Sequence, residues 1–292
     1  MKTSSTLLFA LFALLITSCK WIDPDEQTPA FIYIDDFTFA SGNGTDSEKI
    51  TEVWVFAEGV MLGAYSVPAK VPVLHEGNVS IEMRAGIKNN GISSTRIMYP
   101  FYQPYGTVVN LNPLETDTIT PHFTFKSDLN FALQEDFEIV AGTQFETTSN
   151  SEYTWEVVED SQDPEDVFEG ERSAKLVMDG DGVTWQVESA TDLDLPLGTQ
   201  MWLELNYKCN NTFAIGFNSV RGGTPRKDLA LIVNRTDEET GSPEWNKIYV
   251  DLSVVGQSIV GAEEVYLYIE SVREADVSTA RLWFDNIRIV HF

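Results

Sequence analysis

Apolar and polar residues alternate with a period of two along most of the chain, whereas the 3.6-residue period of a helix is almost absent. In the first half the alternating segments are residues 31–39, 51–56, 79–85, 107–111 and 122–125; in the second half they are residues 153–158, 173–178, 183–187, 201–208, 212–218, 229–234, 246–252, 264–270 and 281–290. Glycine, asparagine, aspartate and proline separate these segments, as is typical of turns between strands. The pattern predicts an all-β protein.

The spacing of strands and turns predicts two β-sandwich domains. Residues 30–126 suit a sandwich of the immunoglobulin or transthyretin type, in which Asn90 and Gly91 supply a hairpin turn. Residues 127–292 contain about nine strands, which are enough for a jelly roll. Prolines confine several first-domain segments to sheet edges or connections, because each proline removes a backbone hydrogen-bond donor.

The first nineteen residues have the organisation of a lipoprotein signal peptide. Lys2 precedes an uncharged apolar run over residues 7–16, which is too short to span a bilayer, and small residues stand directly before Cys19. Cleavage after residue 18 and acylation of Cys19 would leave residues 19–29 as a tether to a membrane surface, because two or more acyl chains anchor stably. The alternative is an ordinary secretory signal that contains a cysteine.

The chain is strongly acidic, with 45 Asp and Glu against 19 Lys and Arg and a formal net charge of -26. Nucleic acid and an anionic leaflet would both repel such a chain, so neither is an expected partner. Once Cys19 is acylated, Cys209 has no partner for a disulfide. Because Cys209 lies in a strand-like run, we expect it to be a small buried hydrophobic residue.

The segment after Cys19 resembles the tether of lipoproteins from the Bacteroidota. Lys20, Trp21 and Ile22 are followed by an acidic, proline-containing spacer, residues 23–26. In those lipoproteins a lysine or glutamine and an acidic cluster next to the lipidated cysteine mark export to the outer face of the outer membrane. The resemblance implies an outer-membrane, surface-exposed protein. A periplasm-facing lipoprotein is the alternative, because Trp21 and Ile22 separate the lysine from the acidic residues.

Residues 32–96 resemble PEGA-type and carboxypeptidase-regulatory-like modules, in which a strand, a glycine turn and a proline-rich strand follow one another. The matching segments are residues 53–56, 58–59, 63–65, 68–69, 71–74 and 76–77. Such modules are spacers or docking surfaces, so the resemblance implies protein interaction.

Aromatic residues and prolines are dense between residues 99 and 105. We expect Phe101, Tyr102 and Tyr105 to form an exposed patch that contacts a partner protein. The alternative is a buried aromatic cluster that closes the bottom of the sandwich.

Residues 127–292 resemble the galactose-binding-like jelly rolls found in carbohydrate-binding modules. The match is carried by the entry segment 136–138, the turn and strand 168–176, the opening 245–247 and the terminal strand 282–289. In sugar-binding members an entry glutamate and a terminal aspartate often share a calcium ion, which here implies Glu138 and Asp285. The alternative is a solvated Glu138 and an Asp285 that caps a turn.

Sugar binding would also need exposed aromatic platforms. The resemblance implies Trp155, Trp185 and Trp245 as candidates, and core packing is the alternative for each of them.

No catalytic constellation stands out in the sequence. The three histidines, His75, His122 and His291, do not form a metal triad or a charge relay, so we do not expect an enzyme. One function that remains is an accessory lipoprotein that docks onto an outer-membrane complex for barrel assembly, secretion or uptake. The other is a cell-surface protein that binds polysaccharide. The first is favoured, because the segment least like a generic module lies in the first domain.

Overall fold

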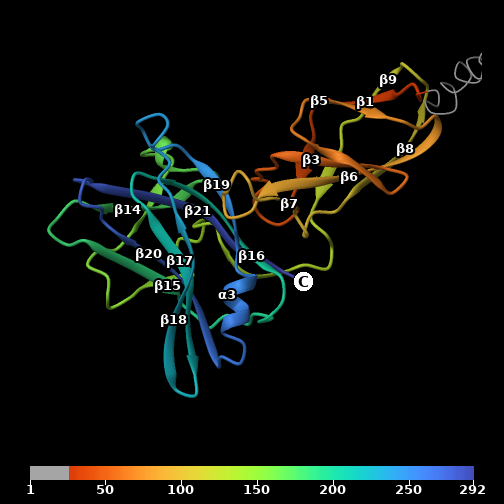
Figure 1. Ribbon diagram of the computed structural model, residues 1–292. Helices are drawn as coiled ribbons and strands as arrows, with labels where there is room; N and C mark the ends of the chain where they lie inside the picture. The colour runs from red at the N-terminus through yellow and green to blue at the C-terminus, as the bar shows by residue number, and fades with distance from the viewer. Residues whose placement is uncertain (1–25) are drawn as a thin grey trace, which may run out of the picture.

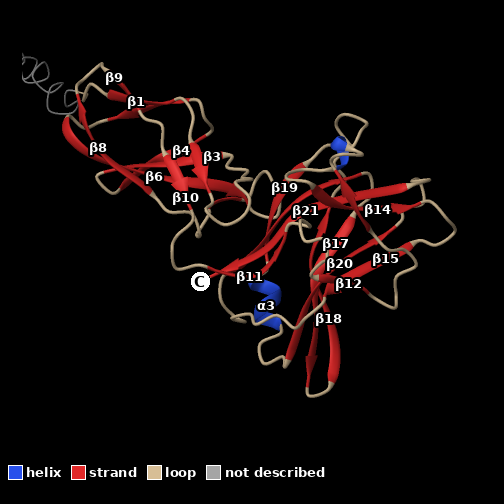
Figure 2. Cartoon of the chain, turned by 180° about the vertical axis from the view of Figure 1, so that it is seen from behind, coloured by secondary structure: helices blue, strands red, loops and turns tan. Residues whose placement is uncertain are grey.

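The computed structural model describes residues 26–292, so the predicted signal peptide and the lipidation residue Cys19 lie outside the described residues. The described chain consists almost wholly of strands, which confirms the all-β prediction. Its helical segments are α3 (Ser253–Ser258) and one 3-10 turn (Pro164–Asp166). Neither is long enough or apolar enough to cross a membrane. Figures 1 and 2 show two β-rich bodies lying side by side.

The first domain contains strands β1 to β10 in three sheets. One sheet has the order β5-β1-β9, a second pairs β10 with β2, and the third has the order β4-β3-β6-β7, with β8 also paired to β6. The strands are β1 (Ala30–Ile34), β2 (Thr38–Ala40), β3 (Glu52–Ala57), β4 (Val60–Tyr65), β5 (Ala69–Val73), β6 (Gly77–Lys88), β7 (Arg96–Met98), β8 (Tyr105–Leu111), β9 (Thr116–Thr118) and β10 (His122–Thr124). The pairs β1/β9 and β2/β10 are parallel.

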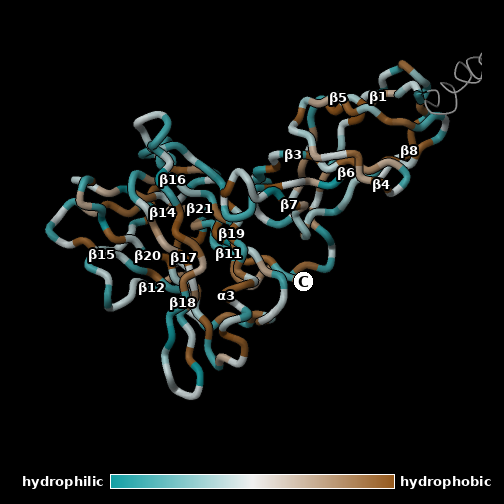
Figure 3. The backbone as a smooth tube through the Cα atoms, viewed as in Figure 1, coloured by the Kyte–Doolittle hydropathy of each residue, from teal (hydrophilic) through white to brown (hydrophobic). Residues whose placement is uncertain are grey.

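Alternate residues of these strands share one core. Ile32 on β1, Val55 on β3 and Ile81 on β6 are fully buried and belong to a single apolar cluster, so the sheets face one another. In Figure 3 the hydrophobic stretches follow the strands, whereas many connections are hydrophilic. Pro72 lies on β5, which pairs only with β1 and is therefore the kind of edge strand that tolerates a missing donor.

The second domain is a sandwich of two sheets. One sheet has the order β13-β14-β21-β16-β19, with β11 also paired to β21, and the other has the order β12-β15-β20-β17-β18. The strands are β11 (Asn130–Glu135), β12 (Phe145–Thr147), β13 (Glu156–Glu159), β14 (Arg172–Met178), β15 (Thr184–Ser189), β16 (Met201–Cys209), β17 (Phe213–Arg221), β18 (Thr224–Val233), β19 (Asn246–Asp251), β20 (Glu264–Val272) and β21 (Ala280–His291). Cys209 at the end of β16 is fully buried, as expected.

Strand β16 is buried along its whole length. Leu203 and Leu205 belong to the core between the two sheets of the second domain. Trp202, on the opposite face, belongs to the apolar cluster of the first domain. The strand has two buried faces because the first domain covers the outer face of its sheet.

A buried ionic cluster joins the two domains. Glu204 on β16 is fully buried, and its Oε2 accepts hydrogen bonds from Arg288 Nε (3.1 Å) and Nη2 (2.8 Å). Tyr99 of the first domain donates its hydroxyl to Glu204 Oε1 (2.7 Å), and Lys247 Nζ lies 3.1 Å from Glu204 Oε2. Burial alone would raise the pKa of Glu204, but Arg288 and Lys247 outweigh it and lower this pKa to about 2. The carboxylate is therefore ionised across the physiological range.

The structure corrects the expectation of an exposed aromatic patch at residues 99–105. Phe101 and Tyr102 are 0% and 3% exposed. The Tyr102 and Tyr249 hydroxyls share a hydrogen bond (2.9 Å), and the ring of Phe101 lies 5.4 Å from that of Trp202. Tyr105 is half-buried against the first-domain core. The two aromatic residues are buried because the second domain supplies apolar surface that removes them from water.

Candidate functional site

The outer face of the five-stranded sheet carries a row of polar and aromatic side chains. Asn218 on β17 pairs with Tyr266 on β20 on one side and with Lys227 on β18 on the other, so the three residues lie in one row across the sheet. Glu188 on β15 pairs with Tyr268 in the next row. Side chains alternate between the two faces of a strand, and the sequence neighbours of Tyr266 and Tyr268 on β20 point into the core instead.

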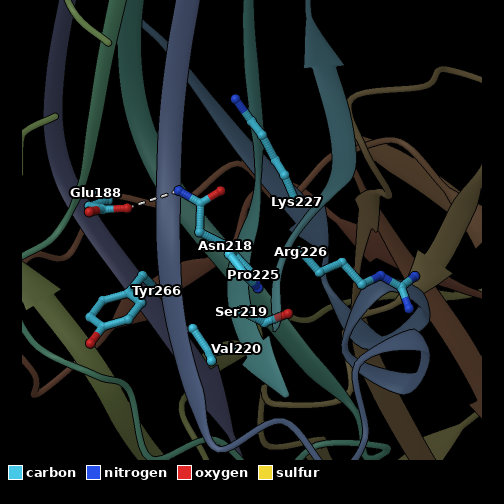
Figure 4. A pocket seen from close by; sticks show the side chains of 8 residues that line it. All are labelled: Glu188, Asn218, Ser219, Val220, Pro225, Arg226, Lys227 and Tyr266. Atoms are coloured by element: carbon cyan, nitrogen blue, oxygen red, sulfur yellow. Dashed lines mark hydrogen bonds between the residues drawn. The ribbon is translucent and has the colours of Figure 1, made fainter. Parts of the chain in front are cut away.

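These rows line an open groove of about 410 Å³. Its lining residues, drawn in Figure 4, are Glu188, Asn218, Ser219, Val220, Pro225, Arg226, Lys227 and Tyr266. Asn218 Nδ2 donates a hydrogen bond to Glu188 Oε2 (2.8 Å), which orients both groups. Tyr266 is half-buried, and its hydroxyl donates to Glu264 Oε2 (3.3 Å). An aromatic ring and an oriented carboxylate–amide pair therefore line the same space.

Tyr268 lies beside the groove, in the next row of the same face. Its ring lies 4.5 Å from Lys227 Nζ, which also forms an ion pair with Glu270. A Cβ atom on Gly216 would clash with the Asp228 carbonyl oxygen and come within 2.8 Å of the Tyr268 ring, so glycine lets both β18 and the ring lie close to β17. Burial raises the pKa of Tyr268 to about 12, which keeps its phenol neutral.

The charged groups of the groove are mostly paired. Arg226 Nε donates to Asp228 Oδ1 (2.9 Å), and Arg226 Nη1 donates to the Ser258 carbonyl of α3 (3.4 Å). With Lys227 paired to Glu270, the groove has little net charge to offer an ion. Such a surface suits a flat molecule with many hydroxyl groups, because the ring can stack on an apolar face while the amide and carboxylate bond to hydroxyls.

The three tryptophans expected to bind sugar lie elsewhere. Trp155 and Trp185 are 9% and 1% exposed and pack against one another and against Phe284 in the core, so the structure corrects their assignment as platforms. Trp245 is half-buried, packs beside Phe168 with its ring tilted by 59°, and lines a separate cavity of about 390 Å³. Of the three, only Trp245 has a ring that a ligand can reach.

The two residues expected to bind calcium do come together. Glu138 and Asp285 line one pocket of about 180 Å³, along with Asp136 and Glu169. This pocket has no basic lining residue, so its negative charge suits a cation.

The carboxylates of this pocket are also engaged by protein donors. Glu138 Oε1 accepts hydrogen bonds from the backbone N–H groups of Glu171 (2.8 Å) and Arg172 (3.0 Å), and Asp285 Oδ2 accepts one from the Ser173 hydroxyl (2.6 Å). Burial raises the pKa of Asp285 to about 7. Within residues 26–292, no three His, Cys, Asp or Glu side chains are arranged to hold a metal ion, so the coordination shell is not preassembled and calcium binding stays a prediction.

Sequence reasoning missed the groove residues Tyr266, Asn218 and Glu188. The strand from Glu264 to Val272 alternates tyrosines with aliphatic residues, and this was the available signal. A strand pattern does not reveal which neighbouring strands stand beside it, so the row across β17, β18 and β20 could not be assembled from sequence.

No protein-family model matches this chain, and no curated protein matches it. Solved structures do resemble it in part. The CBM22-1 and GH10 modules of an endo-1,4-β-D-xylanase from Clostridium thermocellum, complexed with xylohexaose, align with a TM-score of 0.39 at 14% identity, over 56% of this chain and 28% of that chain.

Two further structures span most of their own length. The K1 cleaved adhesin domain of Lys-gingipain from Porphyromonas gingivalis has a TM-score of 0.38 at 14% identity, over 54% of this chain and 96% of that one. A carbohydrate-binding module of the β-sandwich superfamily has a TM-score of 0.37 at 14% identity, over 90% of this chain and 98% of that one. The chain is thus distantly similar in structure to β-sandwich carbohydrate-binding modules and to gingipain adhesin domains.

Proposed function

We propose that this protein is a non-catalytic glycan-binding protein and that the groove on the outer face of the five-stranded sheet holds the glycan. The observation that carries the proposal is the placement of Tyr266 in one row with Asn218, beside the carboxylate of Glu188. The ring of Tyr266 stacks on one sugar ring, while Glu188 and Asn218 accept and donate hydrogen bonds to its hydroxyl groups.

The shape of the groove fits a chain molecule. Its volume of about 410 Å³ is within the range of small-ligand sites, and the groove is open to solvent, so a polysaccharide can continue beyond it. Because Arg226 and Lys227 are already paired with acidic residues, an uncharged glycan is the favoured ligand.

The proposed place of action is the cell surface. Acylation of Cys19 would hold the protein on the outer membrane, with the described domains facing the exterior. There it would retain polysaccharide for neighbouring proteins.

Affinity gel electrophoresis tests the proposal. Soluble xylan, β-1,4-galactan and mannan are set into separate native gels, and retardation is compared between the wild type and Tyr266→Ala. We expect the wild type to be slowed by at least one of these polysaccharides. The variant should bind it roughly 5–30-fold more weakly, because loss of a central aromatic contact costs about 1–2 kcal/mol.

Two matched variants complete the test. Tyr105→Ala removes a half-buried tyrosine of the first domain and should leave retardation unchanged. Trp245→Ala alters the separate cavity and should also leave the retardation unchanged. Retardation that survives Tyr266→Ala but disappears with Trp245→Ala would move the glycan site to that cavity. Absence of retardation by every polysaccharide would remove the support for glycan binding.

Docking onto an outer-membrane protein complex is the second proposed function. Exposed apolar side chains on the first domain support this function, because exposed apolar surface is typical of interaction sites. These side chains are Val60 (63% exposed), Met61 (53%) and Val108 (66%). Replacement of all three by serine should lower co-purification of membrane proteins from solubilised outer membranes and leave glycan retention unchanged. Unchanged co-purification would count against docking through these residues.

A further inference from the structure

A small pocket between the two domains is lined by lysines. It measures about 110 Å³ and receives Lys49 and Lys88 from the first domain and Lys247 from the second. No Asp or Glu is among its lining residues, although the chain has 45 acidic residues against 19 basic ones. In so acidic a chain, a pocket lined by three lysines and by no acidic residue is a local excess of positive charge.

The three lysines of this pocket have few acidic partners in the described part of the chain. Lys247 is only 5% exposed, and its Nζ lies 3.1 Å from a Glu204 oxygen that also accepts a hydrogen bond from Arg288, so two buried cations share one carboxylate. Lys88 takes part in no ion pair within the described part of the chain. Ammonium groups gathered around one small pocket repel one another, so an anion held there would stabilise the native state.

The third lysine is held in place by the second domain. Lys49 Nζ donates to Asn246 Oδ1, and the Lys49 backbone N–H donates to the Tyr249 hydroxyl (2.9 Å). Asn246 Nδ2 in turn donates to the Tyr207 hydroxyl (3.0 Å). Burial, followed by repulsion from Lys88, lowers the pKa of Lys49, as expected for ammonium groups crowded together without an anion.

We propose that this pocket, here called the lysine pocket, binds a small oxyanion, namely a sulfate, phosphate or carboxylate group. Lys49 and Lys88 supply charge-assisted hydrogen bonds, and Lys247 adds positive charge from its place beside Glu204. The volume admits one such group but not a whole sugar ring. The anion is either a free ion or a substituent of an acidic polysaccharide. Because both domains contribute lysines, its binding also ties the domains together. The site is separate from the groove of Tyr266 and does not depend on the glycan-binding function.

Isothermal titration calorimetry on the full chain tests this. Sodium sulfate, sodium phosphate and sodium glucuronate are titrated at constant ionic strength, with sodium chloride as the reference. We expect saturable binding of at least one of them to the wild type. Lys88→Met and Lys49→Met should each weaken it roughly tenfold to a hundredfold, because each removes a charged hydrogen-bond donor. Lys70→Met, at an exposed lysine on β5, is the matched control and should bind like the wild type.

The outcomes separate the possibilities. Thermal melting of each variant without added anion shows whether it folds, and comparison with Lys70→Met removes the general stabilising effect of sulfate on proteins. Binding of the small anions would show that a free ion is sufficient to occupy the lysine pocket. Binding of chondroitin sulfate or polygalacturonate alone, lost in Lys88→Met, identifies a polysaccharide substituent. Absence of saturable binding by all these probes, or binding that Lys88→Met and Lys49→Met leave unchanged, overturns the proposal.

Discussion

Replacing Glu204 by glutamine should destabilise the whole molecule, because this carboxylate neutralises charges buried between the domains. In Glu204→Gln the volume is kept, but Arg288 and Lys247, which are 2% and 5% exposed, lose the anion that they share. The hydroxyl of Tyr99 also loses a charged acceptor at 2.7 Å. Removal of one partner from a buried ion pair costs about 3–5 kcal/mol, because the remaining charge stays buried.

Differential scanning calorimetry at pH 7 measures this loss. For a chain of this size, 3–5 kcal/mol corresponds to a fall in Tm of roughly 6–20 °C. The matched control is Glu82→Gln, since Glu82 forms a 2.6 Å ion pair with Arg84 at the surface, where the side chains are 41% and 43% exposed. That variant should lose at most about 1 kcal/mol.

The pH dependence of the stability difference between the wild type and Glu204→Gln gives an independent check. The folded-state pKa of Glu204 is lowered from 4.5 to about 2, so its stabilising contribution is complete above pH 4.5 and is lost as the pH falls toward 2. The stability difference between wild type and Glu204→Gln should therefore shrink over that interval. A Glu204→Gln variant that melts within 2 °C of Glu82→Gln at pH 7, or a difference that does not shrink in acid, would refute the role assigned to this cluster.

Two further predictions concern the anchor and the acidic pocket. Cys19→Ala should release the protein from the membrane fraction, because it removes the acylation site; a variant that still sediments with membranes, together with an unlipidated wild-type mass, would contradict the anchor. Saturating chelator should lower the Tm of the full chain, because calcium held by Glu138 and Asp285 in the native state alone would stabilise it by mass action. An unchanged melting curve would leave Asp285 as a strand residue held by Ser173.

The strands of the second domain could be predicted closely because their pattern is local. The strand predicted over residues 201–208 corresponds to β16 (Met201–Cys209), and the strand predicted over residues 281–290 corresponds to β21 (Ala280–His291). The short strands β7, β9 and β12 have three residues each, too few for a period of two to stand out.

The errors at the candidate sites have one physical origin. The sequence shows that Phe101 and Trp185 are large and apolar, but not which surface covers them. Phe101 is covered by Trp202, about a hundred residues away along the chain, and Trp185 stacks on Phe284, which is as distant. The sequence analysis placed Glu138 near Asp285 because the resemblance to a jelly roll supplied the order of the strands, and the two residues do line one pocket.

The aromatic contacts between the two domains limit how the domains can be separated by recombination. Phe101 and Tyr102 on one side contact Trp202 and Tyr249 on the other, and all four are buried. Recombination that joined either half to a foreign neighbour would place these rings in water and expose a surface prone to aggregation. We therefore expect recombination to transfer the two sandwiches together as one unit.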